Sequence, residues 1–115
     1  MKRSSRLSRS EDIKRVRQHG CSFVHDSMVL GCHKNPFDHN QYAVIAGKSV
    51  GNAVKRNFAK RRLRSAMHTF QMEIEQGYDL VIIARKPVLN IEYVHLLSAM
   101  KALLLRAGLL KENES

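Results

Sequence analysis

Apolar side chains recur at helical spacing in three segments of the chain and at strand spacing between them. The first helix is expected to begin at Ser10, whose hydroxyl can cap it ahead of two acidic residues, and to end at Gly20. The apolar run over 78–84 is typical of a central strand covered on both faces. The expected order is a helix, one or two strands, a strand, a helix, a strand and a helix, over residues 11–18, 22–33, 42–48, 52–75, 78–84 and 90–108.

Residues 22–33 alternate in polarity, and the pattern leaves open whether they form one bent strand or two. The even-numbered positions from Val24 to Cys32 are the more apolar set, so we expect them to face the core. The opposite face is expected to be open, and it carries Phe23, His25, Ser27, Val29, Gly31 and His33.

This order of elements predicts an α+β fold, a small sandwich with helices packed on a sheet. A chain of 115 residues suffices for one domain, expected over 1–115 with loose ends near 1–6 and 110–115. No apolar run approaches the roughly 18–20 residues that cross a bilayer, and no signal-peptide segment follows the basic N-terminus. We therefore expect a cytoplasmic protein without membrane contact.

The formal net charge of +10 is concentrated in two blocks. Residues 1–20 carry seven basic and two acidic side chains, and residues 48–64 carry seven basic side chains and no acidic ones. The other residues are slightly acidic, with six basic and eight acidic side chains. One such run is ordinarily a solvated helix face, but two in one small domain favour a polyanionic partner.

The helix expected after Asn52 separates its apolar and basic residues at about 100° per residue. Its core stripe consists of Ala59, Leu63, Ala66, Met67, Phe70 and Ile74. A neighbouring arc carries Asn57, Lys60, Arg61, Arg64 and His68, whereas Lys55 and Arg62 point to the other flank. Like charges at i,i+4 cost about 0.2–0.5 kcal/mol per pair, and cations in the first turn oppose the helix dipole. Because the sequence tolerates these costs, we interpret the basic arc as a phosphate-binding surface, which arginine suits especially well.

Cysteine, histidine and carboxylate positions give little support for catalysis by the protein. A zinc set of Cys21, His25, Cys32 and His33 fits no common spacing, and Cys32 would point away from the other three. Two buried thiols in a reducing compartment are the better interpretation. The ten carboxylates are scattered, so we assign no catalytic residue and no metal site.

The stretch 48–64, KSVGNAVKRNFAKRRLR, resembles the signature of the bacterial ribonuclease P protein component. The similarity continues at 6–7, 11–12 and 19–20 before the stretch and at 83–87 after it, and covers about residues 6–105. The chain departs from the family at Phe58, where the family has a second arginine, and at Gly47-Lys48-Ser49.

The resemblance implies an RNA-binding subunit of a nuclease whose catalyst is a large RNA with bound Mg²⁺. The complex removes the 5′ leader of precursor tRNA, and the protein binds that leader and broadens substrate use. A four-stranded sheet and a left-handed crossover through the basic helix are also implied. The protein alone is expected to be inactive, and monomeric outside the complex. The residues implied to dock on the catalytic RNA are Lys48, Asn52, Arg56, Asn57, Lys60, Arg61 and Arg64.

The resemblance also implies a cleft for the leader between the first helix and the sheet. Three aromatic positions of the family cleft are Ile13, Arg17 and Gly31 here. Gly31 would let a nucleotide approach the backbone, and Arg17 would supply a cation in place of an aromatic ring. With the open strand face added, the expected leader-binding set is Ile13, Arg17, His25, Ser27, Val29, Gly31 and His33.

Two alternatives come from other classes of protein. The first is a general RNA-binding module, such as a ribosomal or RNA-chaperone protein, without a part in cleavage. The second is a protein-only nuclease, which the absence of a carboxylate cluster in the sequence disfavours.

Overall fold

The computed structural model describes residues 10–111, so the expected loose end at 1–6 and residues 112–115 of the one expected at 110–115 lie outside the described residues. The elements follow the predicted order, with the first expected strand divided in two and two short 3-10 helices added. They are α1 (Ser10–His19), β1 (Cys21–Val24), β2 (Met28–Lys34), β3 (Gln41–Ile45), α2 (Ala53–Phe70), η2 (Gln71–Glu73), β4 (Tyr78–Ala84), η3 (Lys86–Leu89) and α3 (Tyr93–Arg106).

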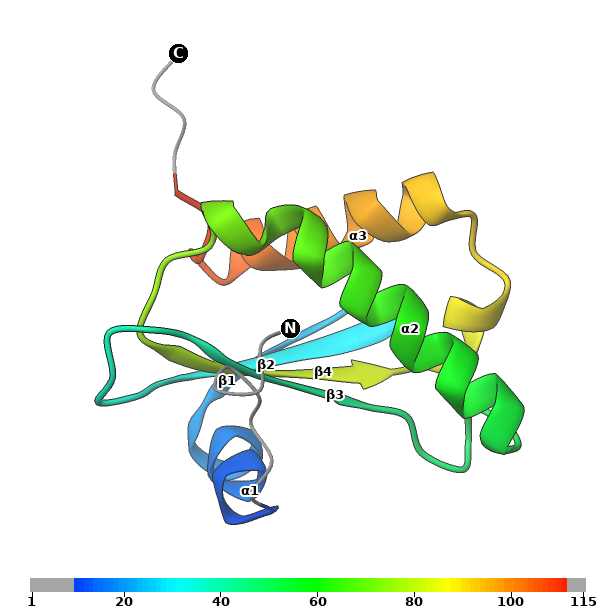
Figure 1. Ribbon diagram of the computed structural model, residues 1–115, viewed down its shortest axis with the longest axis horizontal. Coiled ribbons are helices and arrows are strands. Elements are labelled where there is room, and N and C mark those ends of the chain that lie inside the picture. Colours follow the sequence, from blue (N-terminus) through cyan, green and yellow to red (C-terminus); the bar gives the residue numbers. More distant parts are fainter. Residues whose placement is uncertain (1–9, 112–115) are drawn as a thin grey trace.

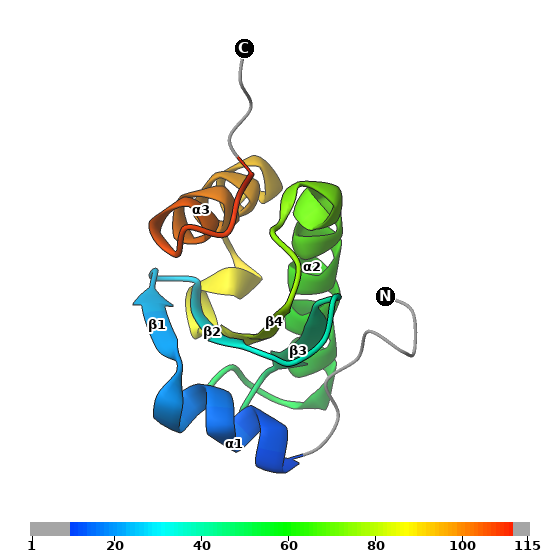
Figure 2. The same ribbon diagram turned by 90° about the vertical axis from the view of Figure 1, so that its left-hand side faces the viewer.

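The four strands form one mixed sheet in the order β1-β2-β4-β3 (Figure 1). β3 is parallel to β4, whereas the other two pairings are antiparallel. α2 and α3 cover one face of the sheet and α1 covers the other (Figure 2). The crossover from β3 through α2 to β4 is left-handed, against the roughly 98% of such connections that are right-handed. The predicted α+β sandwich is confirmed.

Two apolar cores lie on the two faces of the sheet. The large core fills the space beneath α2 and α3, and the whole predicted stripe of α2 from Ala59 to Ile74 is buried in it. The small core lies beneath α1, where Val16 packs with Ala43 of β3 and Val81 of β4. Because α1 buries only Val16 completely, it is held much less firmly than α2.

The prediction that Val24 faces the core was wrong, because 22–33 is a hairpin. His25 and Met28 exchange both backbone hydrogen bonds around a two-residue loop. Phe23 is therefore opposite Leu30 and packs against the large core, while Val24 is opposite Val29 and is 53% exposed. Odd-numbered Phe23 therefore faces the large core on β1, whereas even-numbered residues such as Leu30 face it on β2.

The prediction of two buried thiols holds for Cys32 and fails for Cys21. The two residues are opposite each other on β1 and β2, but Cys21 lies on the edge strand and is exposed. Burial raises the pKa of the Cys32 thiol, and the neighbouring Cys21 raises it further. The Cys32 thiol is therefore a poor nucleophile at neutral pH.

Two predicted helix boundaries also differ from the structure. α2 ends at Phe70 and not at 75, because Ile74 adopts an extended conformation and pairs with Leu110. This bridge, together with a hydrogen bond from Lys111 N to Glu73 O, ties down residues expected to belong to a loose end. Asn90 ends η3 and does not cap α3, whose N-cap is Glu92.

We predict that Leu63→Ala lowers the free energy of unfolding by about 2–5 kcal/mol, since this side chain is completely buried beneath α2. Lys60→Ala is the matched control on the same helix and should leave stability level or slightly raised, because it relieves repulsion among like charges. Urea unfolding followed by circular dichroism measures both variants. Equal destabilisation by the two substitutions would contradict the assignment of the faces of α2.

Candidate RNA-binding interface

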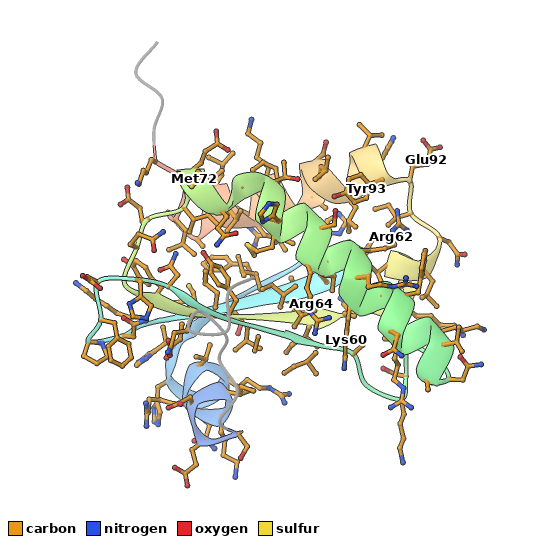
Figure 3. The ribbon with its side chains drawn as sticks, in the orientation of Figure 1. Lys60, Arg62, Arg64, Met72, Glu92 and Tyr93 are labelled. Atoms are coloured by element: carbon orange, nitrogen blue, oxygen red, sulfur yellow. The ribbon has the colours of Figure 1, made fainter. Side chains whose placement is uncertain are left out.

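One flank of α2 is a row of cations beside the core stripe. Arg56, Lys60 and Arg64 are half-buried, with their stems against the protein, and Arg61 is exposed next to them. Figure 3 shows Lys60 and Arg64 on the flank of α2 that faces β3. The helical spacing that buries Ala59 and Leu63 thus turns these residues outward together. We call Arg56, Asn57, Lys60, Arg61 and Arg64 the cationic flank.

The cationic flank has no carboxylate partner in the part of the chain that the structure describes. The salt bridges formed within residues 10–111 are Arg15–Asp12 in α1, at 3.2 Å, and His39–Asp38 in a loop, at 3.3 Å. Neither lies on α2, and its first turn carries no acidic residue. The positive potential of this surface is therefore uncompensated by the described residues, which favours an anionic ligand.

Hydrogen-bonding capacity on the flank is also unused. The Nε atoms of Arg56 and Arg64 are buried and have no partner within the described residues. A hollow of about 230 Å³ opens beside Arg56 and Lys60, and it is bordered by Ala46, Ala53 and Asn57. Reorientation of the two guanidinium groups toward phosphate oxygens would provide the missing partners, so binding gains hydrogen bonds that the free protein lacks.

The loop before α2 places the N-terminus of the helix next to these cations. Gly51 has a φ of +145°, and a Cβ atom there would lie 2.7 Å from Cδ of Lys55. Asn52 is the N-cap, since its Oδ1 accepts a hydrogen bond of 3.0 Å from Lys55 N. Asn52 therefore has a structural role at the position expected to dock on RNA, and Lys48 is exposed in the same loop.

Arg62 lies on the opposite flank, as the helical spacing predicts. Its Nη1 donates a hydrogen bond of 2.8 Å to the carbonyl oxygen of Val88 in η3. Its guanidinium also lies 5.6 Å from the ring centroid of Phe58 and 6.0 Å from that of Tyr93. Figure 3 shows Arg62 on the side of α2 toward Tyr93, away from Lys60 and Arg64. Arg62 therefore links α2 to η3, and its guanidinium has a structural role that the residues of the cationic flank do not have.

The predicted leader-binding residues are divided between the α1 face of the sheet and the hairpin loop. Ile13 packs on the small core. Ile13 and the exposed Arg17 both border a hollow of about 550 Å³ on the surface of α1. Val29 and His33 are half-buried on β2 and point to the face that α1 covers. His25 is at the other end of the face, in the hairpin loop.

Gly31 and Ser27 are buried and do not offer the open surface expected of them. A Cβ atom at Gly31 would lie 3.3 Å from Cγ1 of Val16, so the missing side chain makes room for α1 and not for a nucleotide. Ser27 is 0% exposed, and its Oγ is 2.8 Å from Nδ1 of His25. The prediction that these two positions are accessible was wrong, because helix packing and the hairpin loop use them.

Two cations near the hairpin loop were not among the predicted site residues. Arg85 donates from its backbone nitrogen to Ser27 O at 3.0 Å and from Nη1 to His25 O at 3.2 Å. Lys86 borders a hollow together with His25 and Asp26. Both lie outside the two basic blocks, so charge density could not identify them, although they fall in the stretch 83–87 that carries part of the resemblance.

An α+β sandwich with a left-handed crossover, whose cationic helix has no carboxylate partner within residues 10–111, is typical of a protein that binds a polyanion such as RNA. The family model for Ribonuclease P matches residues 1–108, and the chain belongs to this family. It is 34% identical over 116 residues to the ribonuclease P protein component of Oceanobacillus iheyensis, covering 100% of this chain and 96% of that protein. To the protein component of Dehalococcoides mccartyi it is 36% identical over 115 residues, covering 99% and 94% of the two chains.

Solved structures of the same family have the same fold. The RNase P protein of Staphylococcus aureus superposes with a TM-score of 0.82 at 25% identity, over 93% of this chain and 98% of that one. The RNase P protein of Thermotoga maritima gives a TM-score of 0.78 at 25% identity, over 88% and 96%. The chain is thus an RNA-binding accessory subunit in tRNA 5′ processing, where the RNA subunit is the catalyst. No helix within residues 10–111 is long and apolar enough to cross a membrane.

We predict that Arg64→Ala weakens RNA binding without changing the stability of the protein, and that Arg62→Ala does the reverse. With about five to seven phosphate contacts, the logarithm of the RNA association constant should fall with log salt at a slope of about −4 to −6. Arg64→Ala should make this slope shallower by about one and leave unfolding unchanged.

Arg62→Ala removes the bond to Val88 O, so it should lower the free energy of unfolding by about 1 kcal/mol and leave the slope as it was. Filter binding over a salt series and urea unfolding measure the two quantities. A slope near zero for the unmodified protein, or the same change in both variants, would contradict the assignment of the flanks.

Proposed function

We propose that the cationic flank, together with Lys48 and Asn52, is the surface that docks on the catalytic RNA. The observation that carries this assignment is the absence of any carboxylate partner for the flank within residues 10–111. Repulsion among these cations destabilises the free helix, and RNA phosphates would relieve it. Asn52 contributes by capping the helix, which stabilises the first turn that carries Arg56.

We propose that the precursor tRNA leader binds on the other side of the sheet, along α1. Arg17 supplies a cation at the exposed edge of the hollow on α1, and Ile13 supplies apolar surface next to it. Val29, His33 and His25 continue this face along β2 into the hairpin loop. Because Gly31 and Ser27 are buried, the leader follows the rim between α1 and the hairpin and does not lie on the β2 backbone.

The Mg²⁺ ions of the reaction are proposed to be held mainly by the RNA subunit. No three metal-ligating side chains come together within residues 10–111, so the described residues have no donor set for a catalytic metal pair. The contribution of the protein is electrostatic, since its cations reduce repulsion between RNA and substrate phosphates and lower the Mg²⁺ concentration that assembly needs. Outside the complex we propose a monomer that works in the cytoplasm, where precursor tRNA is made.

The function is tested by reconstitution with the catalytic RNA of ribonuclease P. Protein free of RNA should not cleave precursor tRNA, whereas protein added to the RNA should allow cleavage at a lower Mg²⁺ concentration. Cleavage of an end-labelled precursor over a Mg²⁺ series measures both effects. Turnover by RNA-free protein, or no change in the Mg²⁺ requirement, would contradict the proposal and favour a nuclease or a general RNA-binding module.

The leader site is tested by reversing one charge on α1. Arg17→Glu should raise the dissociation constant of the holoenzyme for leader-bearing tRNA by about tenfold and leave mature tRNA unaffected, since one favourable phosphate contact becomes repulsive. The matched control is Arg15→Glu, which makes the same charge change on the side of α1 where Arg15 pairs with Asp12. Equal losses for both tRNAs, or for both variants, would place the leader elsewhere.

A further inference from the structure

A second hollow lies at the beginning of α2, on the side away from β3. Its volume is about 400 Å³, and it lies between α2 and η3. Its lining combines apolar side chains with three cations and contains no carboxylate: Val54, Lys55, Phe58, Arg61, Lys86, Leu89 and Asn90. An apolar floor with cations and no anions around it fits a ligand that is flat and apolar in one part and anionic in another.

Phe58 is the aromatic ring in this hollow, and a neighbouring cation restrains it. The ring is 41% exposed although it lies in the middle of a basic helix segment, so the core does not explain it. The guanidinium of Arg62 lies 5.6 Å from the ring centroid, and the hydrogen bond to Val88 O holds that guanidinium in place. A ring held by a neighbouring cation needs little ordering when a second flat group stacks on it.

The hollow is continuous with the cationic flank. Arg61 borders the hollow and is also one of the residues proposed to dock on the catalytic RNA. Lys55 and Lys86 border the same hollow, and Lys86 belongs to η3, so positively charged side chains line the hollow on both α2 and η3. An RNA strand that crosses the flank would therefore reach the ring without leaving positively charged surface.

We propose that this hollow binds one unpaired nucleotide of the catalytic RNA, with its base stacked on Phe58. The phosphates on either side of that base contact Lys55, Arg61 and Lys86, and Asn90 lies within the hollow to hydrogen-bond the edge of the base. The inference rests on the proposed docking of the cationic flank and adds to it the class of RNA recognised: a single-stranded or bulged position next to the docked helix.

The chemistry favours a nucleotide over a protein partner. A protein segment of matching chemistry would have to place an apolar side chain between two or three carboxylates, whereas every unpaired nucleotide combines a base with flanking phosphates. Self-association is disfavoured because a second copy would bring the same three cations against these.

The test uses Phe58→Trp, which introduces a tryptophan into a chain that has none. On titration of the full chain with catalytic RNA, the emission of Phe58→Trp should be strongly quenched by stacking, and its affinity should equal that of the unmodified protein. Phe58→Ala and Phe58→Leu should each weaken binding by roughly tenfold, with the salt slope unchanged because no phosphate contact is removed. Their melting temperatures should confirm that the variants are folded.

The control is Met72→Trp, at a side chain that is 89% exposed just beyond the other end of α2 (Figure 3). Its emission should stay unchanged when the same RNA binds. Unchanged emission of bound Phe58→Trp, or full affinity of Phe58→Ala, would overturn the stacking site while docking of the flank stands. Failure of the unmodified protein to bind the RNA would instead overturn the proposed function. A blue shift of Phe58→Trp emission with protein concentration, accompanied by a dimer in sedimentation, would assign the hollow to self-association.

Discussion

The rotation of α2 about its own axis determines which of its side chains reach a partner. Leu63 and Met67 are almost completely buried between α2 and the sheet, and each contributes about 1.5–3 kcal/mol through burial. No other orientation of the helix buries this stripe, so the cationic flank and Arg62 have fixed directions. The stripe therefore holds the binding surface in position without using any residue of that surface.

The free protein bears an electrostatic cost on α2. Cations at Lys55 and Arg56 oppose the helix dipole in the first turn, and Lys60 and Arg64 repel each other at i,i+4. Each of these terms is about 0.2–1 kcal/mol, which is smaller than the burial of one stripe residue. The Asn52 cap offsets about 1 kcal/mol of the total. The helix is therefore stable without RNA, and its repulsion remains available to be relieved on binding.

Elements with a long and regular pattern were predicted correctly from the sequence. The predictions failed where a single turn or a single contact determines the position of a residue. β4 and the α2 stripe follow directly from an apolar run and a helical period. The pattern left open whether 22–33 form one strand or two, because Asp26-Ser27 is not the Asn-Gly or Asp-Gly pair that marks a two-residue loop. Without the position of the turn, the faces of Phe23 and Val24 were assigned the wrong way round. The early end of α2 depends on the bridge between Ile74 and Leu110, a contact between distant residues that no local pattern contains.

The binding surfaces, like the fold, were predictable only where a regular pattern along the chain decides the position of the residues. The cationic flank depends on helical spacing alone, so its residues were predicted together. The leader residues depend on how α1 lies on the sheet, and only the structure shows that Val16 fills the space above Gly31. α2 and α1 lie on opposite faces of the sheet, and they pack on separate cores that meet only through its strands. Substitutions on the two helices should then act independently, since side chains separated by a sheet share no contacts. β2, β3 and β4 are the exception, because each of these strands has residues on both faces of the sheet, and a change there disturbs both surfaces at once.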